Sequence, residues 1–416
     1  EGDKDMAGII KLIFTAFSQS ITSFLYLMII MAVYMQIKRR VQLEETWLGF
    51  LRDTVINRLM NAMLYGMIAG LVTSSLIIVT GVALDLNTII IIWPIALLLT
   101  LLNERYLCFS YAGGLLSLIS IIFGWPEIDV SSVIAIIGVL HFSESILILL
   151  DGHRDALPVV MEHKRFKPIG AFVLGRLWPV PLIILANPSP SLPMAVGALA
   201  MPDWWPILSL HREGELILFP LAILLEYSGL AITAQPKERT RVTGLLLGAY
   251  SLLILSLGVL SVNHTWLKVI GAILMPFLHE VILHFSRSSQ LGGTPLFGAP
   301  WRGLRVLEVL PDRLGSHMGL RSGDVLLNVN GKKINSEEML KETLNNAPNY
   351  LWMDLNRGTK TVTTEYRNYR RDEDKLGVIF VPRKTSRLFL ANEQHGLAYT
   401  LWKRLAQHKH AKEVSE

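Results

Sequence analysis

Long apolar stretches separated by short polar segments fill the first two-thirds of the chain. A helix needs about 20 consecutive apolar residues to cross the hydrocarbon core of a bilayer. Nine stretches approach this length, at residues 14–37, 63–83, 86–102, 107–125, 131–150, 169–186, 216–233, 242–262 and 266–285. The pattern therefore predicts an α-helical polytopic membrane bundle with about nine spans, formed by residues 1–285.

Two of these stretches are irregular. Residues 86–102 are short and contain Pro94, and residues 169–186 contain two prolines at positions 179 and 181. Proline removes a hydrogen bond from a helix, so either stretch could be re-entrant, and the count is open by about two. The first stretch follows an acidic leader and runs directly into Lys38-Arg39-Arg40, the reverse of a cleavable signal peptide. We expect it to remain as a membrane anchor.

The pattern changes at Gly293 to short strands and turns. Residues 305–309 are strand-like, and Asn330-Gly331 is a strong hairpin signal. Ser336 is placed to cap a helix that begins with two glutamates. Residues 293–383 are therefore predicted to form a separate small α+β domain. Residues 384–416 form a basic tail, for which an amphipathic helix on the inner leaflet and a helix packed on the domain are both open.

Composition and charge support the membrane class and give it an orientation. Only 18% of the residues are charged, against about 25% in soluble proteins. Cytoplasmic loops carry an excess of Lys and Arg. With the N-terminus outside, the inner loops hold thirteen such residues and the outer loops hold only Arg212. The inner loops are 38–62, 103–106, 151–168 and 234–241. This distribution predicts a multi-pass protein whose C-terminal domain is cytoplasmic.

The single cysteine, Cys108, lies in an apolar stretch and is interpreted as a small buried hydrophobe. Two features are similar to those of a site-2 metalloprotease: His279-Glu280 precedes His284, and Leu150-Asp151-Gly152 resembles the third-ligand motif of those enzymes. Two histidines must be four residues apart to share a helix face and bind zinc, and these are five apart. No metal ligand and no catalytic residue are therefore assigned.

Several ionisable residues interrupt the predicted spans. Such residues are costly in a membrane and are usually paired or functional. His141 and Glu144 are three apart and share a helix face. Arg176 is expected to pair with Glu226 between helices, and His279 and Glu280 lie in the last span. Polar contacts between helices and a transporter-like proton or substrate path both remain open.

Four motifs in the C-terminal region carry a family resemblance: Gly303-Leu304, Leu310-Pro311, Gly319-Leu320-x-x-Gly323-Asp324-Val325-Leu326 and Asn330-Gly331. The region resembles a PDZ domain of the permuted bacterial kind. The resemblance implies a groove between the strand 304–309 and the helix 336–346, where an extended peptide adds to the strand. A terminal carboxylate would bind the loop 301–304, and an internal segment is equally allowed. The implied peptide-binding residues are Trp301, Arg302, Gly303, Leu304, Arg305, Val306, Met339 and Leu340.

Three further markers lie outside that domain: Tyr34-Met-Gln-Ile-Lys-Arg-Arg40, Gly175-Arg-Leu-Trp-Pro-Val-Pro181 and Pro202-Asp-Trp-Trp-Pro206. Together with the terminal domain, they resemble the membrane-anchored PDZ proteins of Gram-positive bacteria typified by MinJ, a cell-division topological determinant. The resemblance implies a non-enzymatic scaffold at the septum and poles that links DivIVA-like and MinD-like division proteins. No cofactor and no nucleic-acid partner are expected, and homo-oligomerisation is left open. The alternatives are the degenerate metalloprotease and a transporter-like membrane domain regulated by the PDZ domain.

Overall fold

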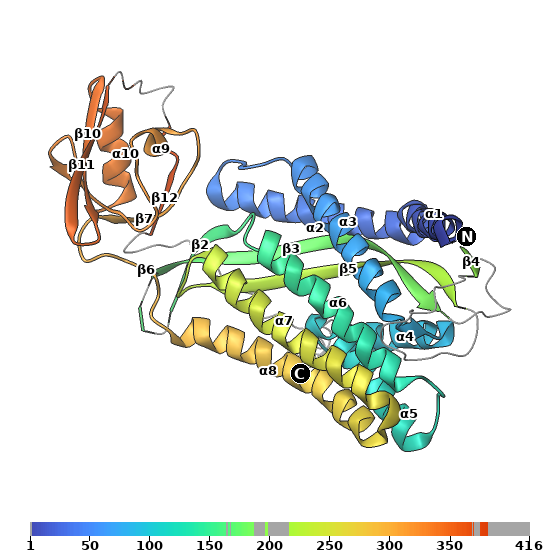
Figure 1. Ribbon diagram of the computed structural model, residues 1–416. Coiled ribbons are helices and arrows are strands. Elements are labelled where there is room, and N and C mark those ends of the chain that lie inside the picture. The colour runs from blue at the N-terminus through green and yellow to red at the C-terminus, as the bar shows by residue number, and fades with distance from the viewer. Residues whose placement is uncertain are drawn as a thin grey trace, which may run out of the picture.

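The computed structural model describes residues 2–163, 165–166, 168–186, 196–198, 216–367, 369 and 375–381. It contains a large unit, in which helices surround a six-stranded sheet, and a smaller C-terminal domain built on a second six-stranded sheet (Figure 1). The predicted tail, 384–416, and the Pro202-Asp-Trp-Trp-Pro206 run lie outside the described residues.

Eight α-helices are described in the large unit. They are α1 (Gly2–Thr22), α2 (Phe24–Leu48), α3 (Val55–Thr80), α4 (Leu86–Leu102), α5 (Phe109–Phe123), α6 (Val130–Asp151), α7 (Pro236–Leu260) and α8 (Thr265–Gly292). Short 3₁₀ turns, η1 (Glu104–Leu107) and η2 (Ser261–Asn263), precede α5 and α8. Helices α2 and α3 begin at capping residues: the hydroxyl oxygens of Ser23 and Thr54 accept hydrogen bonds from main-chain N–H groups.

Four of these helices, α3, α6, α7 and α8, are long and apolar enough to cross a membrane, α7 together with η2. A fifth span is formed if α1 and α2, which are bent by 50° at a short break, count as one. Helices α4 and α5 are apolar but shorter. Seven of the nine predicted stretches thus fall on helices, and the chain has the helices of a multi-pass membrane protein.

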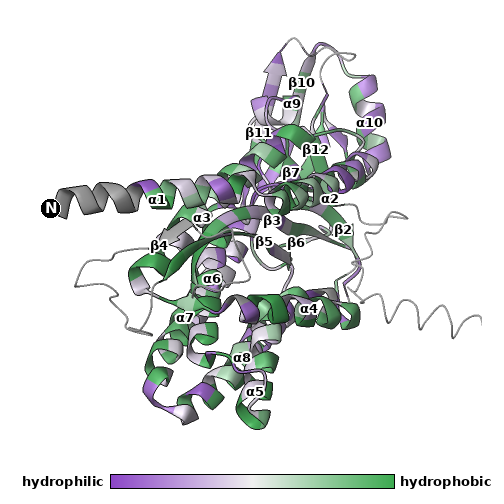
Figure 2. Cartoon of the chain, turned by 90° about the vertical axis from the view of Figure 1, so that its right-hand side faces the viewer, coloured by the Kyte–Doolittle hydropathy of each residue, from purple (hydrophilic) through white to green (hydrophobic). Residues whose placement is uncertain are grey.

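The other two predicted spans are wrong. Residues 169–186 form the strand β3 (Ile169–Ala186), and residues 216–233 largely form the strand β5 (Ile217–Ala231). The two strands pair antiparallel from Phe172 opposite Ala231 to Ala186 opposite Ile217. Strands buried on both faces have nearly continuous apolar sequences, so hydropathy alone cannot distinguish them from a membrane helix. In Figures 1 and 2 this hairpin lies between α1–α3 and α4–α8.

Shorter strands extend the hairpin. They are β1 (Ala83–Leu84), β2 (Leu157–Met161), β4 (Val196–Ala198) and β6 (Phe297–Gly298). β1, β2 and β6 pair with the two ends of β3, and β4 pairs with β5. The middle of β3 is instead covered by α3. A Cβ atom added to Gly66 or Gly70 would overlap the carbonyl oxygen of Pro179 or Pro181, so the helix packs directly on the strand edge.

The contact between α3 and β3 satisfies the strand's polar groups. Proline has no N–H group, so positions 179 and 181 present only carbonyls to the helix. The next N–H group along this edge, that of Ile183, donates a 2.8 Å hydrogen bond to the Ser74 hydroxyl oxygen. Ser74 follows Gly70 by one helical turn. Small residues on α3 and prolines on β3 therefore allow a strand to lie inside a helical membrane unit, where unpaired main-chain groups are costly.

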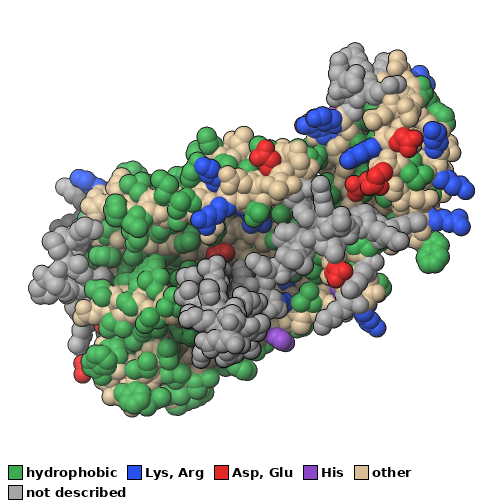
Figure 3. Space-filling model, turned by 180° about the vertical axis from the view of Figure 1, so that it is seen from behind, with side chains coloured by type: hydrophobic (Ala, Val, Ile, Leu, Met, Phe, Trp, Pro, Cys, Tyr) green, Lys and Arg blue, Asp and Glu red, His purple; other side chains and the backbone are tan. Residues whose placement is uncertain are grey.

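The surface of the large unit is apolar. Large hydrophobic side chains on the outer faces of α3, α4, α7 and α8 are about half exposed or more, including Leu64, Leu98, Leu252, Phe277 and Phe285. Figure 3 shows hydrophobic side chains over much of this unit, whereas charged side chains gather on the C-terminal domain. Continuous exposed apolar surface of this kind is typical of a lipid-facing protein.

The C-terminal domain begins at β7 (Leu304–Val309). It continues with α9 (Leu314–His317), β8 (Val325–Val329), β9 (Lys332–Lys333), α10 (Glu337–Asn345), β10 (Tyr350–Arg357), β11 (Lys360–Arg367) and β12 (Val378–Val381). The strand order is β11-β10-β8-β7-β12, with β9 on β8. Ser336 caps α10 as predicted, accepting from the N–H of Met339. Asp324 of the Gly-Asp motif is buried and accepts two hydrogen bonds from Arg357, so its role is structural.

Candidate functional site

The strand predicted to receive a peptide has no free edge. β7 pairs with β8 at Leu304 and Arg305, and it pairs with β12 along its other side from Arg305 to Val309. Two further main-chain bonds join Val306 to the segment before β8. A peptide can add only to an unpaired edge, so the predicted groove along residues 304–309 is wrong.

The predicted binding residues are also placed unsuitably for a ligand. The side chains of Leu304, Val306 and Leu340 are core residues with less than 5% exposure. The rest lie around them: Gly303 is buried with a φ of 81°, Arg305 donates to the Gly298 carbonyl, and Arg302 and Met339 are exposed. Trp301 is 91% exposed on the loop before β7. None of them lines the open edge of the sheet.

The edge strand beside β7 is β12. Among the described residues it pairs only with β7, so its other side carries no partner strand. Val378 lies opposite Val309, and the preceding Gly377 carbonyl accepts from the N–H of Leu310. In this antiparallel pattern the N–H and C=O groups of Val378 point to the side away from β7. The edge for strand addition is therefore β12, near the C-terminal end of the domain.

The carbonyl groups of the loop before β12 point into the domain. The carbonyls of Lys375, Leu376 and Gly377 accept hydrogen bonds from the N–H groups of Leu314, Gly315 and Leu310. The C=O and N–H of one trans peptide unit point in opposite directions. The N–H groups of Leu376, Gly377 and Val378 consequently point away from the body of the domain. The left-handed Gly377, with a φ of 62°, makes this turn possible.

Three consecutive outward N–H groups of this kind can bind an anion such as a peptide's terminal carboxylate. Apolar side chains lie beside it. Leu376 and Val378 at the edge, and Leu344 of α10, are partly buried and pack on the same hydrophobic core. The sequence signal for this site was the Leu376-Gly377 pair before an apolar strand. The sequence analysis assigned peptide binding to the similar Gly303-Leu304 pair, at the other end of the domain, and so did not identify this loop.

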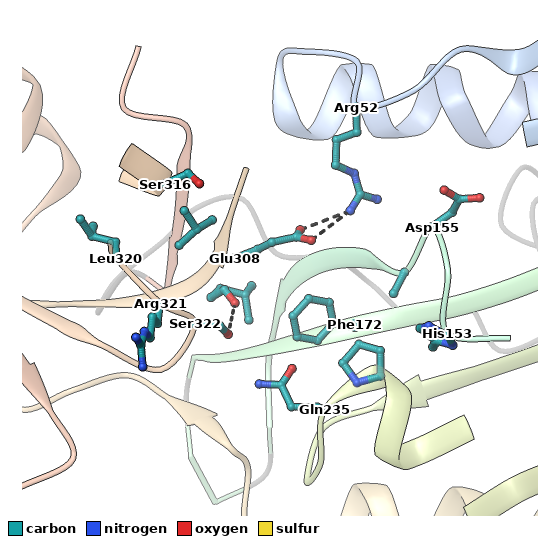
Figure 4. Close-up of a pocket in the computed structure, with 14 residues that line it drawn as sticks. Arg52, His153, Asp155, Phe172, Gln235, Glu308, Ser316, Leu320, Arg321 and Ser322 are labelled. Atoms are coloured by element: carbon teal, nitrogen blue, oxygen red, sulfur yellow. Dashed lines mark hydrogen bonds and ion pairs between the residues drawn. The ribbon is translucent and has the colours of Figure 1, made fainter. Parts of the chain in front are cut away.

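A second feature lies where the C-terminal domain meets the large unit. A cavity of about 450 Å³ is bordered by β7, by α9 and the turn after it, by the loops around Arg52 and Asp155, and by Phe172 of β3 (Figure 4). Arg52 forms an ion pair with Glu308 across it, with 3.3 Å between nitrogen and oxygen. Val381 and Leu307 also pack on the core of the large unit. The two units are thus joined by apolar packing and by one ion pair beside a polar cavity.

Glu308 and His153, which line this cavity, lie outside the predicted spans. Burial raises the pKa of Glu308, and the neighbouring Arg52 opposes that shift. Burial lowers the pKa of His153, and the positive charges of Lys237 and Arg154 add to the effect. Both shifts favour the neutral forms. Burial in this cavity therefore disfavours the charged forms of Glu308 and His153.

The intramembrane polar residues follow the predictions only in part. His141 Nδ1 lies 2.8 Å from a carboxylate oxygen of Glu144, as the spacing of three residues predicted. The expected pairing of Arg176 with Glu226 is wrong. Arg176 forms ion pairs with Asp151 and Asp155. Glu226 lies opposite Leu177, one position along, which places its side chain on the other face of the sheet.

The residues of the two protease-like motifs lie in different environments. Asp151 is fully buried and accepts hydrogen bonds from Arg176 and from the Trp178 indole. His279 is buried and His284 is exposed, although both lie on α8. Sequence reasoning missed one arrangement completely. Cys108, His141 and His279 each offer a metal-ligating atom, and these three atoms lie within 4.8 Å of one another.

Comparisons with known proteins add a distant relationship. No family model matches the chain. The chain is 21% identical over 260 residues to the cell division topological determinant MinJ of Bacillus subtilis (strain 168), covering 62% of each protein. It thus spans about three-fifths of the length of this relative. A solved PDZ domain of an SdrC-like protein from Listeria monocytogenes matches with 15% identity, a TM-score of 0.17, and coverage of 20% of this chain and 92% of that one. The MinJ-like resemblance predicted from the sequence is confirmed at the level of distant homology.

Proposed function

We propose that this protein is a membrane scaffold that captures a partner protein by adding a peptide strand to β12. The observation that carries the proposal is the edge itself. β12 ends the sheet, and the N–H groups of Leu376, Gly377 and Val378 point outward beside it. Main-chain hydrogen bonds supply affinity in this mode of recognition, and neighbouring apolar side chains supply specificity.

The biological setting comes from the relationship to MinJ, whose name describes a cell-division topological determinant. We infer a role in placing the bacterial division site, with DivIVA-like and MinD-like proteins as candidate partners at the septum and poles. The protein acts by binding, not by catalysis. The protease alternative needs Asp151 and His284, but Asp151 forms an ion pair with Arg176, and His284 is exposed whereas His279 is buried.

The revised span count leads us to propose the same orientation. Two predicted spans are strands, and two are helices too short to cross alone. With the bent pair α1–α2 counted as one span, five spans remain, which is still an odd number. An external N-terminus therefore still brings the C-terminal domain to the cytoplasm. The loops 38–62, 151–168 and 234–241 retain twelve of the thirteen basic residues on that side.

The test is a pull-down from bacterial lysate with the full-length protein in detergent. Val378→Pro removes one outward N–H group from the edge, and Leu344→Asp places a charge beside it. Met339→Asp is the matched control, because Met339 lies on the same helix and is 44% exposed. We expect both edge variants to lose the proteins that the wild type captures and the control to keep them.

Thermal unfolding of each variant separates lost binding from lost folding. The proposal is abandoned if well-folded Val378→Pro and Leu344→Asp proteins capture the same partners as the wild type. Capture that depends on Trp301 or Arg302 instead would return the site to the loop predicted from sequence. A substitution at Leu304 is unsuitable as a test, because that side chain is in the core.

A further inference from the structure

A cysteine and two histidines from three helical segments meet inside the large unit. Cys108 lies at the junction of η1 and α5, His141 near the middle of α6, and His279 near the middle of α8. The Cys108 sulfur is 3.4 Å from His141 Nε2 and 3.8 Å from His279 Nε2. Both histidines are less than 8% exposed, and Cys108 is partly buried.

The hydrogen bonds around the cluster fix the state of both imidazoles. Glu144 lies 2.8 Å from His141 Nδ1, and a carboxylate only accepts, so this Nδ1 carries the proton. Tyr111 donates its proton to Glu280 at 2.7 Å, so its oxygen can only accept from His279 Nδ1 at 3.3 Å. In the neutral imidazoles, both Nε2 atoms therefore carry no proton, and both lie within 4 Å of the Cys108 sulfur.

This is the outer shell of a metal site. Histidine ligands usually donate their second ring N–H to a carboxylate or another acceptor, which fixes the tautomer and orients the ring. Tetrahedral zinc has Zn–S and Zn–N bonds of about 2.3 and 2.0–2.1 Å, which place sulfur and nitrogen ligands about 3.6 Å apart. The two observed sulfur–nitrogen distances lie on either side of this value.

A purely structural role explains the arrangement less well. A thiol is a weak hydrogen-bond donor and acceptor, so two buried histidines gain little by directing Nε2 at it. The stronger partner is Ser110, whose hydroxyl lies 2.6 Å from His141 Nε2. An ion between the three ligands would replace that hydrogen bond.

We propose that Cys108, His141 and His279 form a binding site for a zinc-type transition metal ion inside the membrane unit. A thiolate with two imidazoles suits zinc and excludes magnesium and calcium, which take oxygen ligands. The ion ties the start of α5 to α6 and α8. Glu144 and Tyr111 are positioning residues, because they act through the histidines.

The first experiment needs no substitution, because Cys108 is the single cysteine of the chain. The full-length protein in detergent is stripped with a chelator, and alkylation by iodoacetamide is followed by mass spectrometry with and without Zn²⁺. We expect Zn²⁺ to slow alkylation strongly. Equal rates would overturn the proposal, and fast alkylation unaffected by Zn²⁺ would instead indicate a cysteine–histidine nucleophile.

The second experiment measures bound Zn²⁺ after equilibrium dialysis. The wild type is expected to hold one ion per chain that Cys108→Ser and His279→Ala lose. His284→Ala is the control, since His284 is exposed on the same helix. Glu144→Gln keeps the ligands and should weaken Zn²⁺ binding about 10–100-fold. Zinc retained equally by His279→Ala and His284→Ala, or Glu144→Gln binding as tightly as the wild type, would contradict the site.

Discussion

The close contact between α3 and β3 predicts that adding a methyl group at Gly70 destabilises the protein. In Gly70→Ala the new Cβ would overlap the Pro181 carbonyl oxygen and lie 3.1 Å from its carbon. Carbon atoms prefer separations of about 3.5–4.0 Å, so the strand must retreat on the order of 1 Å. Overpacking of this kind costs about 1–3 kcal/mol. The hydrogen bond from Ile183 to Ser74, worth about 1 kcal/mol, is then stretched, and alanine's helix propensity returns about 1 kcal/mol.

The net loss is therefore about 1–3 kcal/mol, which corresponds to a fall in Tm of roughly 2–12 °C at about 2–4 °C per kcal/mol. The assay is thermal unfolding of the full-length protein in detergent, followed by tryptophan fluorescence. Gly292→Ala is the matched control, because a Cβ there meets nothing within 4 Å. Equal Tm values for the two variants would refute the close packing of α3 on β3.

Three further predictions concern the C-terminal domain. Asp324→Asn weakens the two hydrogen bonds from Arg357 and should destabilise the domain by about 1–3 kcal/mol; faster limited proteolysis of the full chain would reveal it, and an unchanged rate would contradict it. Glu308 has a raised pKa in the folded state, so stability should fall as the pH rises through the interval between its ordinary value of 4.5 and the raised one. Glu308→Gln should abolish that fall without lowering the Tm at neutral pH. A lower Tm would mean that the ion pair with Arg52 stabilises the protein more than burial of the carboxylate destabilises it. Trp301→Ala should change the Tm by less than the equivalent of about 0.5 kcal/mol and leave peptide capture intact, because the side chain is 91% exposed.

Local signals were sufficient for much of the fold. Length and hydropathy identified α3, α6, α7 and α8, and the Gly-Asp and Asn-Gly motifs located the C-terminal domain. The spacing of three residues placed His141 against Glu144. The β3–β5 hairpin was missed because a buried strand and a membrane helix are both apolar throughout. One signal was available: Pro179 and Pro181 repeat with the two-residue period of a strand.

The candidate sites required information that local sequence does not contain. Which strand has a free edge depends on the order of strands in the sheet, and β12 is reached only at the end of the domain. Cys108 is 33 residues from His141 and 171 residues from His279. No spacing rule for one helix applies to ligands from three segments. The rejected motif used His279 with the wrong partner, His284.

The two strands β7 and β12 pack on the hydrophobic cores of both units of the protein. Leu304, Val306 and Phe380 face the core of the C-terminal domain, whereas Leu307 and Val381 pack on the core of the membrane unit. If peptide addition to β12 changes the free energy of the contact between the two units, thermodynamic reciprocity requires that the same contact changes peptide affinity by the same factor. Peptide binding at β12 and the state of the membrane unit would then be coupled through this contact.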